Sequence, residues 1–198
     1  IKTPDAIHLA TALLAGCTAE VPPPDDKLPQ LLSGYQLFDG DLSQLSLSRG
    51  VIRYSVNAPS FCDYAQTDRV LKLPSGQAIR YQPNGTLEFP VGTVLAQTFS
   101  YATTPESANR RIIETRILLR RSDKWIGLPY VWNQAQTEAT LELVGGRIPV
   151  QRVMADGSIR EQTHLVPNFN DCKRCHRIGD EVTPLAITVR QLNCPLPD

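Results

Sequence analysis

The residues with the clearest chemical potential lie near the end of the sequence, as Cys172-Lys173-Arg174-Cys175-His176. On a helix, two thiols three positions apart lie about one turn from each other, and an imidazole follows at once. Two sulfurs at this spacing can reach the two vinyl groups of one porphyrin, while His176 turns beneath the ring toward its iron. This spacing is the c-type haem attachment motif. We therefore expect one covalent haem c on Cys172 and Cys175, with His176 as the proximal iron ligand.

Two alternatives use the same thiols. A zinc knuckle would be completed by His176 with Cys194 or His164, and a thioredoxin-like dithiol would use Cys172 and Cys175 alone. Structural zinc ribbons usually have a second pair of ligands at knuckle spacing, and the sequence contains none. A redox dithiol is expected beside a βαβ pattern, which the sequence also lacks. Haem attachment is therefore the favoured interpretation.

The sixth coordination position of the iron has two candidate ligands, Met154 and His164. Met154 is the only methionine of the chain, and both residues precede the motif. Strand packing is the more ordinary role for Met154, and a hydrogen bond at a strand edge is the more ordinary role for His164. A five-coordinate haem is the third possibility.

The N-terminal residues resemble a lipoprotein signal. Leu14-Ala15-Gly16-Cys17 follows a modest apolar stretch and resembles the lipobox of bacterial lipoproteins, in which Cys17 would be acylated. An amphipathic helix over residues 3–16 is the alternative interpretation. Because c-type haem is attached outside the bacterial cytoplasm, the two motifs support each other. We expect an exported protein, periplasmic or at the cell surface, with residues 1–17 as signal segment and a lipid anchor at Cys17.

With Cys17 assigned to the lipid and Cys172 and Cys175 to the haem, two cysteines remain, Cys62 and Cys194. In an oxidising compartment we expect them to form a disulfide. The bridge would tie the C-terminal tail to the rest of the chain, and its long loop predicts a stabilisation of roughly 3 kcal/mol or more.

The composition excludes some partners. Lys plus Arg and Asp plus Glu both number 20, so the formal net charge is zero, and no basic stripe stands out that could neutralise phosphates. No run of 18 apolar residues is present, so an ordinary membrane-spanning helix is not expected. We expect no nucleic-acid partner, and contact with a membrane only through the lipid anchor.

The pattern of apolar residues predicts a mainly β fold. Sixteen prolines and twelve glycines punctuate short runs rich in β-branched and aromatic residues. Glycine-containing turns such as Ser75-Gly76, Gly145-Gly146 and Asp156-Gly157 separate several of these runs, which favours antiparallel pairing. The expected strands cover residues 51–56, 69–73, 78–81, 85–89, 93–101, 111–121, 125–132, 139–144 and 148–154. We expect an antiparallel sandwich or jelly-roll-like domain with a short C-terminal helical segment.

The chain divides into four segments. After the signal segment, residues 18–29 form a proline-rich tether, residues 30–165 a β-rich domain, and residues 166–198 a haem-attachment segment packed on that domain. Asp171 is a good N-cap candidate for a short helix that carries the cysteines. Because 22 residues follow His176, we expect the β domain to supply much of the haem pocket.

Several further segments carry a resemblance to a known family. They are Ala58-Pro59-Ser60-Phe61-Cys62-Asp63-Tyr64-Ala65, Phe89-Pro90-Val91-Gly92-Thr93, Glu114-Thr115-Arg116, Tyr130-Val131-Trp132-Asn133, Val166-Pro167-Asn168 and Arg190-Gln191-Leu192-Asn193. Together they resemble secreted bacterial c-type cytochrome-like proteins, in which a β-rich region precedes a single CxxCH motif. The likeness covers about residues 30–193, and it implies export and haem binding.

The functional expectation is electron transfer through the haem to or from a redox partner protein. The alternative is an extracellular ligand-binding module, such as one for carbohydrate, with a structural zinc or a secondary haem site. Peroxide chemistry would need an open sixth position and a distal acid-base residue, which the sequence does not identify. For Glu114 and Arg116 we expect a structural ion pair, with contact to haem propionates as the alternative.

Overall fold

Antiparallel strands dominate the computed structural model, which describes residues 28–82, 87–105, 109–178, 181–184 and 187–194. Strands make up 43% of the structure and helices 11%, so the prediction of a mainly β, antiparallel fold is confirmed. The expected signal segment with Cys17, and residues 18–27 of the expected tether, lie outside the described residues. No helix in the described part of the chain is long and apolar enough to cross a membrane.

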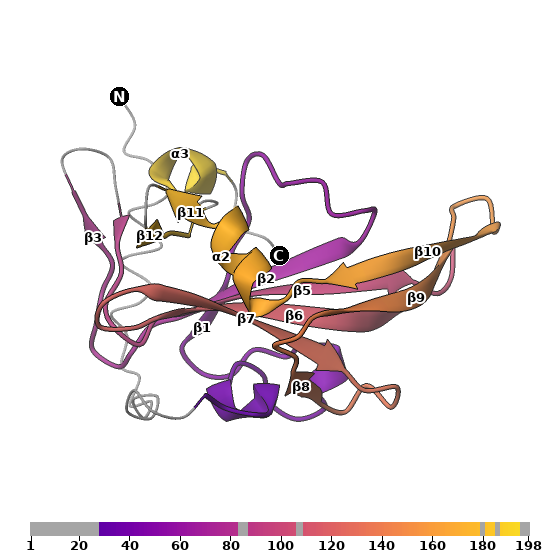
Figure 1. Cartoon of the computed structure of the whole chain (residues 1–198), viewed down its shortest axis with the longest axis horizontal. Helices are drawn as coiled ribbons and strands as arrows, with labels where there is room; N and C mark the ends of the chain where they lie inside the picture. Colours follow the sequence, from indigo (N-terminus) through magenta and orange to yellow (C-terminus); the bar gives the residue numbers. More distant parts are fainter. Residues whose placement is uncertain (1–27, 83–86, 106–108, 179–180, 185–186, 195–198) are drawn as a thin grey trace.

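A six-stranded antiparallel sheet forms the centre of the molecule (Figure 1). Its strand order is β1-β2-β5-β6-β7-β8. The strands are β1 (Val51–Arg53), β2 (Gln66–Lys72), β5 (Val94–Ala102), β6 (Arg110–Arg120), β7 (Trp125–Trp132) and β8 (Ala139–Leu141). A small separate hairpin pairs β3 (Arg80–Tyr81) with β4 (Leu87–Glu88).

One face of the sheet packs against two short 3-10 helices, η1 (Leu32–Tyr35) and η2 (Leu42–Gln44), and we call it the 3-10 face. Register places a row of apolar residues across it, and each is at most 2% exposed: Val70, Ala96, Ile117 and Leu128. Successive side chains of a strand point to opposite faces, so this row fixes which residues face the other way.

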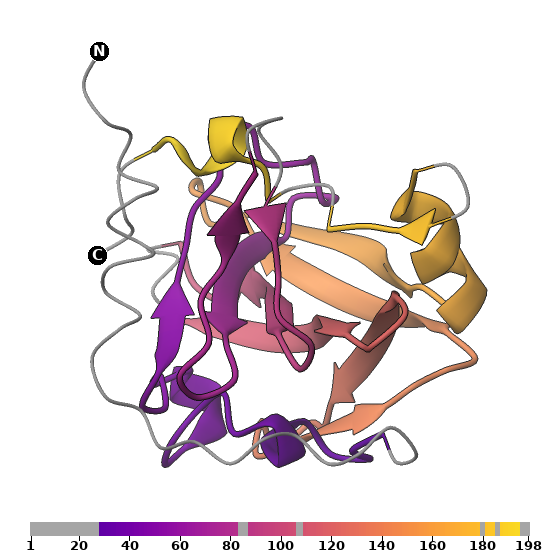
Figure 2. The ribbon, with the colours of Figure 1, turned by 90° about the vertical axis from the view of Figure 1, so that its left-hand side faces the viewer.

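The opposite face lies under the C-terminal segment, and we call it the α2 face. Its apolar row is Leu71, Leu95, Leu118 and Gly127. The first three pack in a cluster with Trp125, Ile187 and Leu192, which joins the sheet to the C-terminal elements. In the turned view the C-terminal elements (orange to yellow) lie well apart from the 3-10 helices (indigo), which occupy the base of the molecule (Figure 2).

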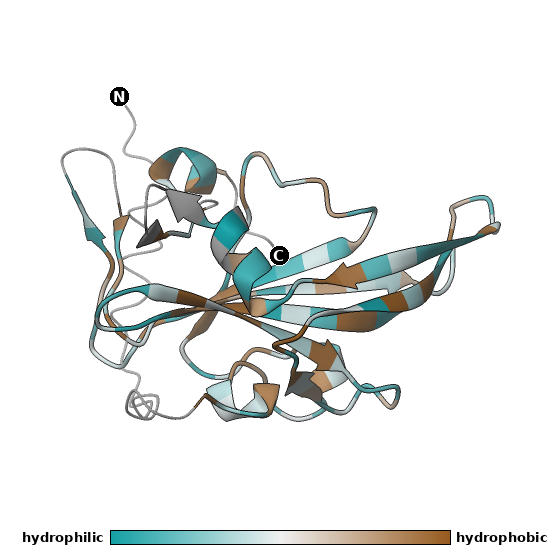
Figure 3. Ribbon diagram, in the orientation of Figure 1, coloured by the Kyte–Doolittle hydropathy of each residue, from teal (hydrophilic) through white to brown (hydrophobic). Residues whose placement is uncertain are grey.

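A two-stranded ribbon, β9 (Gly146–Val153) and β10 (Ile159–Val166), lies beside β5 and projects to the far end of the molecule (Figure 1). The second full sheet of a sandwich is not present in the described ranges, and the ribbon packs on the sheet through Tyr101, Ile113 and Val150. β10 was not expected from the sequence. Of its eight residues, His164 and Val166 alone are buried, so a long apolar run is missing (Figure 3).

The C-terminal segment contains α2 (Phe169–Cys175), β11 (Arg177–Ile178), β12 (Glu181–Val182) and α3 (Val189–Leu192). The N-cap of α2 is Asn168, not Asp171 as predicted. Asp171 is the third helical residue and closes a capping box with Asn168. The helix therefore begins three residues earlier than expected, and Cys172 lies within it.

Candidate functional site

The contact between α2 and β7 positions the cysteine motif. A methyl group built on Gly127 would lie 2.6 Å from Cys172 Cβ and 3.3 Å from its Sγ, so glycine lets the helix approach the strand this closely. Cys172 is accordingly buried at 8% exposure. Cys175 ends the helix, and its side chain lies outside the described part.

The backbone of Thr183 makes two hydrogen bonds to His176, one to its backbone carbonyl and one to its imidazole ring. Thr183 N donates to His176 O at 2.6 Å, and His176 Nδ1 lies 3.2 Å from Thr183 O. A carbonyl oxygen can only accept, so Nδ1 donates, and Nε2 of the neutral ring keeps its lone pair. Burial lowers the pKa of His176; the Thr183 bond opposes this, and the Arg116 charge adds to the lowering. The ring is therefore held neutral, which is the form that binds metals.

A buried polar network lies next to this segment on the α2 face. Glu114 is fully buried, and Arg116 donates to it twice, from Nε to Oε1 and from Nη2 to Oε2, both at 2.8 Å. Arg116 also donates to Leu165 O at 3.2 Å, and its guanidinium lies 4.3 Å from the centre of the Phe99 ring. The expected ion pair between Glu114 and Arg116 is therefore present.

His164 continues the network. Its Nε2 is 2.7 Å from Glu114 Oε2, and its Nδ1 is 3.0 Å from the Tyr101 hydroxyl. Because the ionised carboxylate only accepts, Nε2 donates to it, and in the neutral ring Nδ1 accepts from Tyr101. Burial raises the pKa of Tyr101, which keeps the proton on that hydroxyl. Both ring nitrogens of His164 are engaged, so in this arrangement neither can bind iron.

Met154 lies at the far end of the β9 and β10 ribbon. It follows β9 directly, and its backbone closes the turn with Ser158 and Gly157. β10 then runs back for eight residues, roughly 25 Å, before α2 begins three residues beyond it. Met154 therefore lies far along the ribbon from α2 and His176.

The expected disulfide is not formed, since Cys62 and Cys194 are both free thiols. Each sulfur bonds locally: Cys62 Sγ to Ser60 O at 3.3 Å and Cys194 Sγ to Gln191 O at 3.7 Å. The predicted attachment of the tail is made by other groups. Asn57 Nδ2 donates to the carbonyls of Arg190 and Asn193 at 2.8 and 2.9 Å. Hydrogen bonds thus replace the covalent tie.

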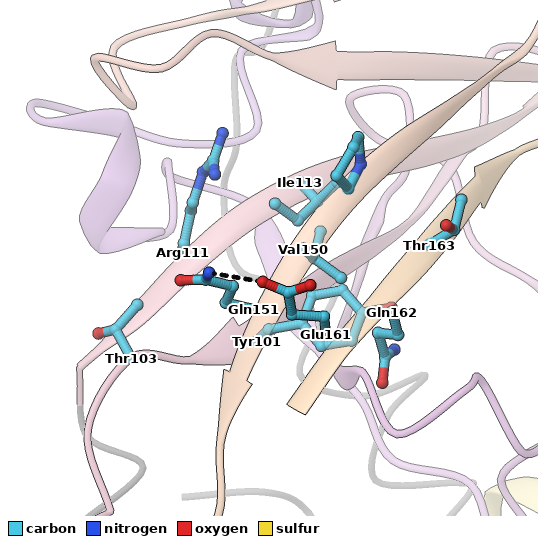
Figure 4. A pocket seen from close by; sticks show the side chains of 10 residues that line it. Tyr101, Thr103, Arg111, Ile113, Val150, Gln151, Glu161, Gln162 and Thr163 are labelled. Atoms are coloured by element: carbon cyan, nitrogen blue, oxygen red, sulfur yellow. Dashed lines mark hydrogen bonds between the residues drawn. The ribbon is translucent and has the colours of Figure 1, made fainter. Parts of the chain in front are cut away.

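Two depressions flank the network. The one in Figure 4 lies along the seam between the ribbon and the sheet, with Tyr101, Ile113 and Val150 as floor and a Gln151 to Glu161 hydrogen bond on its rim. The Tyr101 hydroxyl on its floor is hydrogen-bonded to His164 and faces no free space of its own in this seam. The other, of about 590 Å³, adjoins the first turn of α2, and its wall includes Arg116 and Asp171. This second cavity is the one next to the motif.

Three comparisons, with protein-family models, with curated proteins and with solved structures, found no match to this chain. Among the described side chains, no group of three or more His, Cys, Asp or Glu residues is placed to hold a metal ion. The zinc alternative therefore finds no complete ligand set in that part of the chain. The functional argument depends on the geometry around α2.

Gly127→Ala tests the contact that seats α2. The added methyl group would collide with Cys172, so we expect a loss of about 1 to 3 kcal/mol in the free energy of unfolding, measured with urea. Gly146→Ala is the matched control, because nothing lies within 4 Å of a methyl group there. Equal stability of the two variants would show that α2 does not need the close approach.

Glu114→Gln tests the buried network. The change leaves the Arg116 cation without its counter-charge, so we expect a loss of about 3 kcal/mol in the free energy of unfolding. The control is Asp68→Asn, which breaks the more exposed pair with Arg110 and should cost about 1 kcal/mol or less. Similar losses in both variants would contradict a special role for the buried carboxylate.

Proposed function

We propose that this chain is an exported c-type haem protein that transfers single electrons through one haem. The haem is bound through thioethers at Cys172 and Cys175, with His176 as proximal ligand. The supporting observation is the state of His176: it directly follows the helix that carries both cysteines, and its Nδ1 donates to Thr183 O. Nε2 is thereby left for the iron.

The bond from Nδ1 has a known consequence for metal sites. Metal-binding histidines almost always donate their other ring N–H to a carbonyl or carboxylate, which fixes the tautomer and the ring orientation. A dithiol gives no reason for an oriented imidazole directly after the second cysteine, whereas a bound metal ion does. Bound haem supplies reversible one-electron chemistry at its iron.

The surroundings of α2 suit a large apolar cofactor with an acidic edge. The cluster of Trp125, Ile187 and Leu192 covers the α2 face on one side, and the Arg116 cation is close enough to His176 to help lower the pKa of its ring. His164 is held by Glu114 and Tyr101 and is not free to act as a distal acid-base group, which favours electron transfer over peroxide chemistry.

The remaining parts of the proposal come from the sequence. Export to the periplasm or cell surface, a lipid anchor at Cys17 and a redox partner protein agree with the place where c-type haem is attached. The ligand-binding alternative would be favoured by an exposed aromatic strip along a sheet. The exposed pair Phe61 and Tyr64 lies instead in a loop, 5.0 Å apart and edge to face. That arrangement gives the alternative less support.

Haem staining after expression in a host that matures c-type cytochromes tests the proposal. The full chain should stain on a denaturing gel and change its visible spectrum reversibly on reduction. Cys172→Ser with Cys175→Ser should abolish the stain, because both thioethers are then lost. Cys62→Ser and Cys194→Ser are matched controls that should keep it, since both lie outside the motif. A wild-type chain that stays colourless under these conditions would refute the proposal.

The axial ligands give a second test. Met154→Leu should leave the visible spectra of oxidised and reduced protein unchanged, because Met154 lies at the far end of the ribbon from α2. His176→Ala should alter both spectra, since the proximal ligand is then missing. Loss of a methionine-ligand signature in Met154→Leu would show that the ribbon folds back onto the haem.

A further inference from the structure

Exposed apolar side chains gather around the cavity beside the first turn of α2. Val144, which is 84% exposed, and the half-exposed Leu165 lie in the cavity wall itself. Single exposed apolar residues are ordinary, but a group of them around one hollow marks an interaction site. Of the nine exposed large apolar side chains in the described residues, five line this cavity or flank its walls, and we call them the cavity patch: Phe61, Tyr64, Leu143, Val144 and Leu165.

The loop of residues 57–65, between β1 and β2, supplies the aromatic part of the cavity patch. Asp63 of this loop lines the cavity, and Gln162 Nε2 of β10 donates to its carbonyl at 2.7 Å. Asp63 and Tyr64 have φ values of 47° and 62°, in the left-handed region that favours glycine. Strain of this kind is common at binding sites. It holds the exposed Tyr64 ring beside Phe61, with 5.0 Å between the ring centres.

Three arginines border the cavity patch without a counter-charge. Arg147 lines the cavity, the Arg152 guanidinium lies 4.3 Å from the centre of the Tyr64 ring, and Arg160 is the partner of Arg152 in the ribbon. No ion pair joins any of the three to a carboxylate in the part of the chain that the structure describes. Like charges directly opposite each other destabilise a strand pair, so the fold itself gains nothing from placing Arg152 and Arg160 there.

The acidic residues of the cavity wall do not cancel this charge. Asp171 is paired with Arg174 at 3.0 Å, so these two groups balance each other. Asp63 is the remaining acid of the wall, against three unpaired arginines. The patch therefore has an excess of positive charge, although the whole chain has a formal net charge of zero. Aromatic and arginine side chains are also the types that protein interfaces favour.

We propose that the cavity patch is the docking surface for the redox partner, and that this partner is an acidic redox protein with an apolar centre to its contact surface. The inference rests on the proposed function and names where its partner binds. The cavity adjoins the helix that carries Cys172, so a partner seated there lies next to a haem attached at that residue. The positive excess selects an acidic surface and speeds its approach. A second copy of the chain would bring the same arginines to a two-fold contact, where they would repel.

The rate of electron transfer from an acidic flavodoxin tests this docking surface in the haem-loaded protein. One electron passes from the flavodoxin hydroquinone, which becomes the semiquinone, to the ferric haem, which becomes ferrous. At low salt, Arg147→Glu and Arg160→Glu should each lower the second-order rate constant about tenfold, because the encounter loses its electrostatic attraction. The matched control is Arg80→Glu on the exposed strand β3, which should keep a rate close to that of the wild type. Wild-type rates in both patch variants would overturn the proposal.

The apolar part of the cavity patch is tested in the same way. Val144→Ser should lower the rate constant about fivefold, because less apolar surface is buried on docking. Val91→Ser is the matched control, since Val91 is also exposed but lies outside the patch. A photogenerated deazariboflavin radical, which is small and uncharged, should reduce all variants at the wild-type rate, since it needs no docking surface. Losses that are equal with the radical and with flavodoxin would assign the effect to a disturbed haem and overturn the docking surface.

Binding without haem separates this proposal from the proposed function. In the full chain with Cys172→Ser and Cys175→Ser, oxidised flavodoxin should still bind at low salt in calorimetry, and Arg147→Glu should weaken the binding about tenfold. If no haem attaches to the wild type, that result would keep an acidic partner at the patch and reject its redox role. Absence of binding, or self-association of the chain that Val144→Ser abolishes in sedimentation, would reject the acidic partner itself.

Discussion

The close approach of α2 to β7 is the contact on which the candidate site depends. A missing side chain at Gly127 lets Cys172 rest directly on the sheet, and the capping box of Asn168 and Asp171 fixes where the helix starts. About one helical turn separates the two cysteines. His176 follows the second cysteine, and the backbone of Thr183 bonds both its carbonyl and its ring. The contact at Gly127 thus fixes how closely the helix approaches the sheet, and the capping box fixes the residue at which the helix begins.

Charge distinguishes the α2 face from the 3-10 face. The 3-10 face is packed with apolar side chains, as a sheet face in a core should be. The α2 face is apolar at one end and carries Arg69, Gln97, Arg116 and Glu114 toward the other. Burying such groups gives a fold little stability of its own. The His164 and Tyr101 extension of the network is fully paired and needs no ligand.

The sequence predicted the mainly β class, most strands of the sheet and the local spacing of the motif, because these depend on short-range patterns. It missed β10, whose exposed side chains carry no apolar alternation, and it therefore missed that His164 on this strand faces the sheet, where it bonds Glu114 and Tyr101. The pairing of Cys62 with Cys194 came from counting thiols, and in the structure both are free, while Asn57 ties the tail through backbone carbonyls. That Arg69 of β2, Gln97 of β5 and Arg116 of β6 lie side by side depends on the register of distant strands, which no local pattern reveals.

The mass of the peptide that contains residues 172–176, measured together with the metal content of the intact protein, tests the central claim most directly. The account predicts one haem on that peptide and one iron per chain when the protein is matured in a competent host. An unmodified peptide, with zinc or no metal in the protein, would contradict it.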